Sequence, residues 1–399
     1  MLLVARACLL IAQTFARMLK YLQIDSPRRK ARTEMASAPR FIMIGGFLGA
    51  GKTTTISKLA SRFRAQGKNV AIVTNDQAAD LVDTLLLRSQ GFQVGEVAGS
   101  CFCCNFDALT GTVESLSAQQ RPDIVLAEPV GSCTDLVATV IRPLEQIYDQ
   151  PFEIAPYGVI IKPSHGSKIL GGEGQRGFSP KAAYIFRKQI EEADFIILNR
   201  IDELASDEID NLARLLSEEY SSIPVIRMSA KTGAGFDALC EFLDQQGAFG
   251  QRVMEVDYDI YAEGEAELGW LNCQAKLTAS KPMELDEFLM KLLGSLHQQL
   301  IAIEAEVAHL KVIGLAEGVY AVANLVSNAD QPVLSLPSSW QGNDIDLVIN
   351  ARVALAPEQL ELLVREVVSA QATAMSAHAK ILTLQCFRPG RPVPTHRLN

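Results

Sequence analysis

Hydrophobic and polar positions follow a regular alternation from Phe41 to about Gln246. Short apolar runs rich in β-branched residues alternate with longer stretches whose apolar positions have helical spacing. The short runs predict strands at Phe41–Ile44, Val70–Thr74, Ile124–Ala127, Val159–Ile161, Phe195–Leu198 and Val225–Met228. The longer stretches predict helices, among them Lys52–Gln66, Pro180–Glu192 and Asp207–Tyr220. Strands this apolar are typical of a parallel sheet covered by helices on both faces, so we expect an α/β domain.

A different pattern follows a weakly patterned segment at 247–264. It predicts, in order, a strand at Leu268–Leu277, an amphipathic helix at Glu284–Ala305, strands at His309–Leu315, Val319–Val326 and Asp344–Val353, a helix at Pro357–Ser369 and a strand at Lys380–Cys386. This order suggests a ferredoxin-like α+β sandwich. We therefore divide the chain into an N-terminal extension (1–34), the α/β domain (35–247), a linker (248–264), a smaller α+β domain (265–387) and a flexible tail rich in Pro and Arg (388–399).

The N-terminal segment Met1–Tyr21 is rich in Leu, Ala, Ile and Arg. Arg6 and Arg17 interrupt its apolar run, so it does not reach the roughly 20 residues that a membrane span needs. It is interpreted as an extension before a mis-assigned start, as an amphipathic surface helix, or as a signal peptide. We favour the first, because Met35 lies just before the first predicted strand.

Composition narrows the possible partners and compartment. Apolar residues make up 48% and charged residues 21%, as in ordinary globular proteins, and the formal net charge of −9 argues against a general nucleic-acid binder. The chain has eight cysteines. Three of them fall within four residues and the others are scattered, which is not a disulfide framework. We therefore expect a reducing, cytoplasmic setting.

The segment from Gly46 to Thr53 carries the strongest chemical signal. Gly46-x-x-x-x-Gly51-Lys52-Thr53 fits the phosphate-binding P-loop, and it stands between a predicted strand and a predicted helix, as that motif requires. Glycines let backbone N–H groups turn toward the phosphates. Lys52 would neutralise phosphate charge, and the Thr53 hydroxyl would ligate Mg²⁺. The motif predicts an Mg²⁺-dependent protein that binds a nucleoside triphosphate.

Two later segments indicate which base is bound. Asn199 and Asp202 follow a predicted strand, and a carboxylate there can accept from the ring N1–H and the amino group of guanine, which adenine lacks. The run Ser229-Ala230-Lys231 closes the next strand, where a second base-binding loop is expected. We therefore predict guanine rather than adenine.

Acidic residues at two strand ends are candidates for the metal and the attacking water. Glu128 follows the strand Ile124–Ala127, and we expect it to hold Mg²⁺ through water, with the Gly131 N–H sensing the γ-phosphate. Asp76 follows the second strand and would assist Mg²⁺ or position water; its alternative interpretation is a helix cap or turn residue. With Thr53 these two complete the predicted Mg²⁺ site, and Lys52, Asp76 and Glu128 are the predicted catalytic residues.

Cys101, Cys103 and Cys104 lie in a Gly/Ser-flanked loop between these nucleotide segments. Three thiolates so close in sequence can bind Zn²⁺ or another thiophilic cation. The motif lacks a fourth ligand, which could be water, a carboxylate, a group from a partner, or Cys133.

Together these motifs resemble the CobW/HypB/UreG GTPases. The resemblance rests on Gly-Gly-Phe-Leu-Gly-Ala-Gly-Lys-Thr-Thr-Thr from Gly45, then Thr-Asn-Asp, Cys-x-Cys-Cys, Glu-x-x-Gly and Asn-Arg-x-Asp, and it covers about Phe41 to Gln246. The Cys-x-Cys-Cys element indicates the CobW-like branch. The resemblance implies a GTPase that delivers a transition metal or a cobalamin-type cofactor to a client metalloprotein. The resemblance implies that phosphate is bound by Gly46, Gly49, Gly51, Lys52, Thr53 and Thr54, guanine by Asn199 and Asp202, and the metal by Cys101, Cys103 and Cys104. To the predicted GTP-binding residues we add Ala50 of the P-loop and the run Ser229, Ala230 and Lys231.

The chain departs from the family pattern in places. Gln77-Ala-Ala-Asp80 replaces the usual Glu-Phe-Gly-rich stretch, and Lys162-Pro163-Ser164-His165 stands where Val-Asp is usual. We interpret His165 as a loop histidine rather than a metal ligand. The sequence shows no obvious arginine finger, so we expect slow intrinsic GTP hydrolysis that depends on a client or on a partner in a possible homodimer.

Three functions are compatible with these features. The favoured one is a metallochaperone-like GTPase whose nucleotide state repositions the cysteine loop. The second is a GTPase switch or chaperone of a metalloenzyme without direct metal transfer, in which the cysteines are structural. The third is a P-loop kinase with a small-molecule acceptor.

Overall fold

The structure is a computed structural model that describes residues 38–76, 82–170 and 179–399. Outside the described residues lie the predicted N-terminal extension (1–34) with Met1–Tyr21, Met35 after it, and the departure at Gln77–Asp80. Among the helices within these ranges, none combines the length and apolar character that crossing a bilayer requires.

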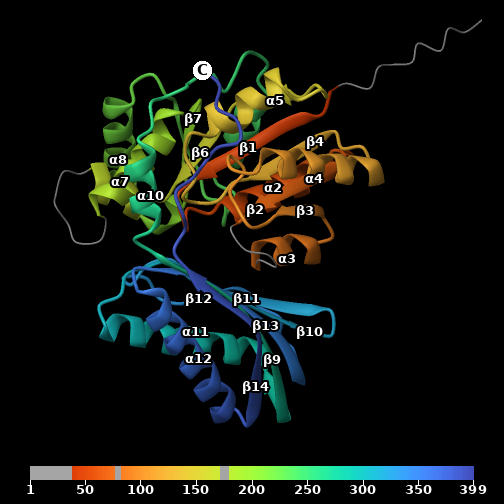
Figure 1. Cartoon of the computed structure of the whole chain (residues 1–399), viewed down its shortest axis with the longest axis vertical. Coiled ribbons are helices and arrows are strands. Elements are labelled where there is room, and N and C mark those ends of the chain that lie inside the picture. Colours follow the sequence, from red (N-terminus) through yellow and green to blue (C-terminus); the bar gives the residue numbers. More distant parts are fainter. Residues whose placement is uncertain (1–37, 77–81, 171–178) are drawn as a thin grey trace, which may run out of the picture. The chain divides into compact units, whose positions relative to one another are not determined.

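The first sheet is parallel and carries strands in the order β3-β2-β4-β1-β6-β7-β8, with β5 also paired to β1 (Figure 1). Its strands are β1 (Arg40–Gly46), β2 (Val70–Asn75), β3 (Gln93–Val97), β4 (Ile124–Glu128), β5 (Glu153–Ile154), β6 (Gly158–Ile161), β7 (Phe195–Leu198) and β8 (Val225–Arg227). The predicted parallel α/β fold is therefore confirmed. Sequence reasoning missed β3 and β5, because Gly95 and Glu96 interrupt the apolar run of β3 and β5 has only two residues.

Alternating side chains of the buried strands fill a separate core on each face of this sheet. Phe41 and Met43 belong to one core, and Ile42 and Ile44 to the other. The helices of this part are α2 (Lys52–Ala65), α3 (Val82–Ser89), α4 (Phe106–Gln119), α5 (Arg142–Gln146), α6 (Pro163–Leu170), α7 (Pro180–Glu191), α8 (Ser206–Glu219) and α9 (Phe236–Leu243), with a π-helical turn at Val137–Ile141 and a 3₁₀ turn at Ile201–Glu203. All carboxyl ends of the parallel strands meet at one edge, where α/β proteins bind their ligands.

The second sheet is antiparallel, with strand order β12-β11-β10-β13-β9-β14. Its elements are β9 (Gly269–Glu284), α11 (Leu285–Ala302), β10 (Val307–Ala316), β11 (Val319–Leu325), β12 (Val333–Leu336), β13 (Gln341–Val353), α12 (Pro357–Ala374) and β14 (Ala377–Phe387). The sequence β9-α11-β10-β13-α12-β14 with spatial order β14-β9-β13-β10 is the ferredoxin-like arrangement, extended at one edge by β11 and β12. The predicted α+β outline is confirmed.

Helices α11 and α12 cover one face of the second sheet, and their leucines and valines form its core (Figure 1). The opposite face contributes Ile313, Val322 and Val348, which pack with Val82 of α3 in a small apolar cluster. This face of the second sheet therefore contacts the start of α3, close to the ligand-binding edge of the first sheet.

Two connecting segments differ from their description as linker and tail. The predicted linker contains helix α10 (Tyr258–Glu265), whose N-terminus is capped by the Asp257 carboxylate. The segment 388–399 runs back to the part of the chain that carries the first sheet (Figure 1). There Arg397 donates to the buried Asp135 carboxylate at 2.8 Å and the Leu398 N–H donates to Ala138 O of the π-helical turn at 2.9 Å. The predicted domain limits themselves stay predictions.

Candidate nucleotide and metal site

The P-loop connects β1 to α2 through two positions that only glycine suits. Gly46 has φ 127° and Gly51 has φ 101°; a Cβ would lie 2.1 Å from Ile160 O in the first case and 2.4 Å from Asn199 Nδ2 in the second. Gly51 caps α2, so free backbone N–H groups and the positive end of the helix dipole point into the loop. The buried Lys52 ammonium donates to Gly46 O at 2.9 Å, inside the loop that it is predicted to serve.

Two of the three residues predicted for Mg²⁺, Thr53 and Glu128, meet at the start of α2, whereas the third, Asp76, is bonded to Arg352. The Thr53 hydroxyl donates to Glu128 Oε1 at 2.9 Å, while Glu128 Oε2 is buried and has no hydrogen-bond partner among the described residues. Asp83 in the first turn of α3 lies beside the Thr53 hydroxyl and lines the same cavity. A hydroxyl, an unsatisfied carboxylate oxygen and a second carboxylate form the hard oxygen donor set that Mg²⁺ prefers, so the residues fit this ion. Sequence reasoning missed Asp83.

Burial sets the charges of this site. Burial, assisted by the negative charge of Asp83 and opposed by Lys52, raises the pKa of Glu128 to about 7. Burial is the largest single influence on Asp83 and favours its neutral form, but the nearby Lys311 and His309 together with hydrogen bonding outweigh it and lower the pKa of Asp83 to about 2. The pKa of Lys52 is lowered, chiefly by burial. The site therefore binds a cation best where Glu128 is ionised.

The end of β2 places Asn75 and Asp76 in different environments. Asp76 accepts from one Arg352 nitrogen through both carboxylate oxygens, at 2.8 and 2.9 Å. Asn75 is buried; its amide donates to Val97 O and Ser100 O at 2.9 and 2.8 Å, and its oxygen accepts from the Phe102 N–H at 2.8 Å. Asn75 thus holds the cysteine loop while its neighbour Asp76 lines the nucleotide cavity.

The predicted base-binding residues gather at the ends of β7 and β8. Asn199 is buried and joins two loops: its amide donates to Ala50 O, and its oxygen accepts from the Ala230 N–H, both at 2.8 Å. Asp202 is exposed in the 3₁₀ turn after β7 and lines the same cavity as Lys231. Ser229 is fully buried, and its hydroxyl accepts from the Thr232 N–H. Asn199 is therefore a link between the loops, and Asp202 is the carboxylate available to a base.

A cavity of about 580 Å³ unites these groups, and its size suits a nucleotide. From the first sheet it is lined by the P-loop, Asp76, Asp83, Glu128, Gly131 and the base-binding loops. The second sheet contributes Trp270, His309, Lys311 and Arg352. These four were not predicted for the site, because nothing in their local sequence relates them to a P-loop more than 200 residues away.

The three cysteines form one cluster. The Cys101 sulfur lies 2.9 Å from the Cys103 sulfur and 3.3 Å from the Cys104 sulfur, and the latter two are 3.6 Å apart. Hydrogen bonds from Cys103 and Cys104 lower the pKa of the Cys101 thiol well below its usual range. Sulfurs around a tetrahedral zinc are about 3.8 Å apart, so this cluster would need to spread by less than about 1 Å. The Cys133 thiol lies near Cys101 but is not one of the three sulfurs of the cluster; its role as fourth ligand stays a prediction.

The C-terminal segment covers this cluster. The Thr395 N–H donates to Cys103 O at 2.8 Å, and the Val393 N–H donates to the Cys104 sulfur. The His396 ring meets the Phe106 ring edge-on with centroids 5.3 Å apart. The sequence gives no sign of these contacts, because the residues that make them are almost 300 positions apart along the chain.

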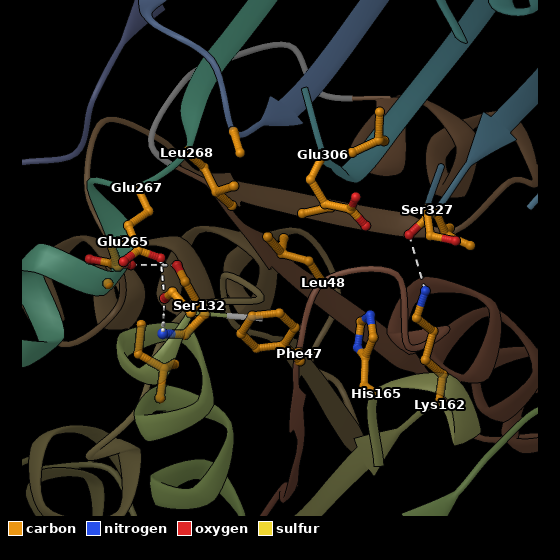
Figure 2. Close-up of a pocket in the computed structure, with 18 of the residues that line it drawn as sticks. Phe47, Leu48, Ser132, Lys162, His165, Glu265, Glu267, Leu268, Glu306 and Ser327 are labelled. Carbon is orange, nitrogen blue, oxygen red and sulfur yellow. Dashed lines mark hydrogen bonds between the residues drawn. The ribbon is translucent and has the colours of Figure 1, made fainter. Parts of the chain in front are cut away.

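A second, smaller cavity of about 180 Å³ lies beside the P-loop, and Figure 2 shows Phe47 and Leu48 facing Leu268 and Glu306 across it. Leu48 lines both cavities. At one end the Ser132 hydroxyl bonds to the buried Glu265 carboxyl, and at the other Lys162 donates to Val326 O at 3.0 Å. His165, for which a loop position is predicted, lies in α6 with its ring 5.4 Å from that of Phe47.

Known proteins are similar to the part of the chain that carries the P-loop and the cysteine cluster. Residues 40–227 match the family described as CobW/HypB/UreG, nucleotide-binding domain. Among curated proteins, the chain is 27% identical over 175 residues to the zinc chaperone YeiR of Escherichia coli (43% of this chain, 49% of the relative) and 24% identical over 228 residues to the zinc chaperone CobW of Sinorhizobium sp (51% and 62%). It is also 30% identical over 129 residues to the signal recognition particle receptor FtsY of Neisseria gonorrhoeae (31% and 30%).

Among solved structures, Zn(II)-bound YjiA GTPase from E. coli matches with a TM-score of 0.33 and 13% identity, over 83% of this chain and 99% of that one. The chain spans between 30% and 62% of the length of the three curated relatives. The matched family domain contains the P-loop, Glu128, the cysteine cluster and Asn199 with Asp202. Residues 40–227 of this chain therefore match the nucleotide-binding domain of the CobW/HypB/UreG family.

Proposed function

We propose that this chain binds GTP with Mg²⁺, hydrolyses it slowly to GDP and phosphate, and couples its nucleotide state to a thiophilic metal ion for delivery to a client metalloprotein. The observation that carries the proposal is the position of Asn75. Its side chain makes one hydrogen bond to the end of β3 and two to the loop that holds the cysteine cluster, and the next residue, Asp76, lines the nucleotide cavity. A movement at the nucleotide is thereby passed to the metal ligands through one residue.

The phosphate end of the cavity supports nucleotide hydrolysis. In the proposed complex the P-loop N–H groups from Gly46 to Thr54 bind the phosphates, and the Lys52 ammonium exchanges Gly46 O for phosphate oxygens. Thr53 and Glu128, with Asp76 and Asp83 beside them, would hold Mg²⁺, which would neutralise charge on the phosphates when bound. Water adds to the γ-phosphorus, the bond to the bridging oxygen breaks, and the released proton leaves with the products.

The base end supports guanine as the preferred base. Asp202 is exposed to the cavity and would accept from the ring N1–H and the amino group of guanine. Asn199 contributes by fixing the Ala230 loop against the P-loop, so that Ser229, Ala230 and Lys231 present their backbone to the base. A site built to pair with these donors discriminates strongly against a base that lacks them.

The cysteine cluster supports an ion as the cargo. Cys101 and Cys103 are buried and Cys104 is half-buried, and the three sulfurs lie within 4.8 Å of one another. This enclosed arrangement suits a single ion such as Zn²⁺ better than a cobalamin-type cofactor. The names of the relatives YeiR and CobW, both zinc chaperones, favour the same cargo.

The test begins with protein purified without oxygen, in which bound metal, Zn²⁺ affinity and GTP turnover are measured. We expect about one Zn²⁺ per chain and a Zn²⁺ affinity that differs between the GDP form and the form with a non-hydrolysable GTP analogue. Cys103→Ser should lose metal binding, whereas Cys240→Ser, a buried cysteine of α9 remote from the cluster, should keep it. Unchanged metal content in Cys103→Ser would refute the cargo proposal and favour the GTPase switch without metal transfer.

Asn75→Ala tests the coupling. This variant should still bind GTP and Zn²⁺, but its Zn²⁺ affinity should be the same in both nucleotide forms. Phosphate transfer from GTP to an added small molecule instead of water would favour the P-loop kinase.

A further inference from the structure

Two cations of the second sheet project toward the triphosphate end of the nucleotide cavity. Lys311 lies on β10 and Arg352 on the neighbouring β13. In the antiparallel ladder His309 is opposite Arg352 and Lys311 is opposite Asn350. Because side chains alternate between the two faces of a strand, these four residues lie on one face of the sheet. His309, Lys311 and Arg352 line the same cavity as Lys52 and Thr53.

Each of the two cations is paired with a carboxylate next to the Mg²⁺-site residues. Lys311 forms an ion pair with Asp83, which lies beside the Thr53 hydroxyl. Arg352 is paired with Asp76 at 2.8 Å. Between them, Asn350 accepts from the Val82 N–H at 2.9 Å. Asp76 at the end of β2 and Val82 and Asp83 at the start of α3 are therefore bonded to a single face of the second sheet.

Arg352 is held rigidly in place from its own side. Its guanidinium donates to Leu271 O and Ala351 O at 3.1 and 2.9 Å and lies 4.2 Å from the centre of the Trp270 ring. Its side chain is only 2% exposed, so its rotamer is fixed without help from Asp76. A guanidinium positioned in this way loses little entropy when it binds a phosphate.

Charges at this end of the cavity are balanced only while no nucleotide is present. Lys52, Lys311 and Arg352 stand against an equal number of carboxylates, Asp76, Asp83 and Glu128. A triphosphate adds several negative charges, and hydrogen bonds from a cation to phosphate are among the strong ones. For Lys311 and Arg352, a phosphate of the bound triphosphate is then a stronger partner than a carboxylate.

We propose that Lys311 and Arg352 are γ-phosphate-binding residues supplied by the second sheet, which hold Asp83 and Asp76 in the nucleotide-free chain and exchange them for the γ-phosphate when GTP binds. This inference rests on the proposed GTP binding and adds to it how the chain would distinguish GTP from GDP. The exchange breaks the ion pairs Lys311–Asp83 and Arg352–Asp76. It leaves both carboxylates available to the Mg²⁺ site. The sequence motifs contain no arginine finger, and Lys311 and Arg352 of the same chain would supply positive charge to the γ-phosphate instead.

The test measures the affinities of the full chain for fluorescent GTP and GDP analogues and compares their ratio between variants. Lys311→Met keeps the aliphatic stem and removes the charge, and Arg352→Lys keeps the charge but removes the fork. The ratio is informative because changes to the nucleotide-free chain affect both affinities equally. We expect the GTP-over-GDP preference to fall about tenfold or more in Lys311→Met, and by a smaller factor in Arg352→Lys.

Lys276→Met is the matched control, because Lys276 is an exposed lysine on β9 of the same sheet; its ratio should equal that of the unmodified chain. Thermal unfolding by circular dichroism identifies a variant that has lost its fold, in which case the other variant decides. An unchanged ratio in folded Lys311→Met and Arg352→Lys would overturn the inference while leaving GTP binding intact. An unmodified chain that binds neither nucleotide would overturn the proposed function and this inference together.

Discussion

Glu128 should make nucleotide binding depend on pH near neutrality. Its carboxylate is buried against the Thr53 hydroxyl, and burial raises its pKa from 4.5 to about 7 in the nucleotide-free chain. A carboxylic acid with a raised pKa is neutral below about pH 7, and a neutral group is a poor Mg²⁺ ligand. Tight binding of Mg²⁺ with GTP therefore requires Glu128 to lose its proton.

The size of the effect follows from the pKa. With a pKa of about 7, roughly 9% of Glu128 is ionised at about pH 6 and roughly 91% at about pH 8, so GTP affinity in the presence of Mg²⁺ should rise about tenfold over this interval. In the nucleotide-free chain the sign is opposite for folding: ionising Glu128 disfavours the fold, so its contribution to stability is lost as pH rises from 4.5 toward about 7. Glu128→Gln should remove both dependences.

The assay is equilibrium binding of a fluorescent GTP analogue with excess Mg²⁺, from about pH 5.5 to about pH 8.5. The triphosphate itself titrates near pH 6, and this contribution is common to both proteins, so it cancels in the ratio of the Glu128→Gln and unmodified affinities. Glu241→Gln, an exposed glutamate of α9, is the control and should follow the unmodified chain. Parallel pH profiles for Glu128→Gln and the unmodified chain would refute the role given to Glu128.

Four further variants test other parts of the structure. Lys52→Ala should abolish tight GTP binding, because Lys52 is the buried cation inside the P-loop; near-normal affinity in a filter-binding assay would contradict this placement. Asp202→Asn should weaken GTP binding at least about tenfold and favour xanthosine triphosphate, whose ring carries an oxygen where guanine has an amino group, as competition titrations would show. Thr395→Pro removes the N–H that bonds to Cys103 O and should speed the reaction of the cysteine cluster with a thiol reagent; an unchanged rate would show that the C-terminal segment does not shield it. Burial raises the pKa of Glu265 to about 8, so the buried carboxyl costs stability as pH rises from 4.5 to about 8, and Glu265→Gln should gain a few kcal/mol over the unmodified chain at about pH 9 in urea unfolding, with no gain near pH 4.

Much of the nucleotide site could be predicted because its chemistry is contiguous. The P-loop needs glycines, a lysine and a threonine in one turn between a strand and a helix, and β1, the loop and α2 occupy the predicted positions. Glu128 and Asn199 could be predicted to approach this loop, because the carboxyl ends of parallel strands meet at one edge of the sheet. Hydrophobic periodicity was sufficient for the buried strands and for both long helices of the second sheet. It failed for β3, whose partly exposed residues carry no continuous apolar run.

The sequence by itself determined which segments carry phosphate, base and metal chemistry, because each of those motifs is read within a few residues. Only the tertiary structure decided what surrounds them. Lys311 and Arg352 reach Asp83 and Asp76 across more than 220 residues of chain, and the segment from Val393 to His396 reaches the cysteine cluster across almost 300. Such contacts depend on strand order and register, which place residues side by side without leaving a local pattern. Asn75 lies between these two cases. Its position next to Asp76 is readable in the sequence, but its bonds to the end of β3 and to the cysteine loop exist only because β2 and β3 pair in parallel.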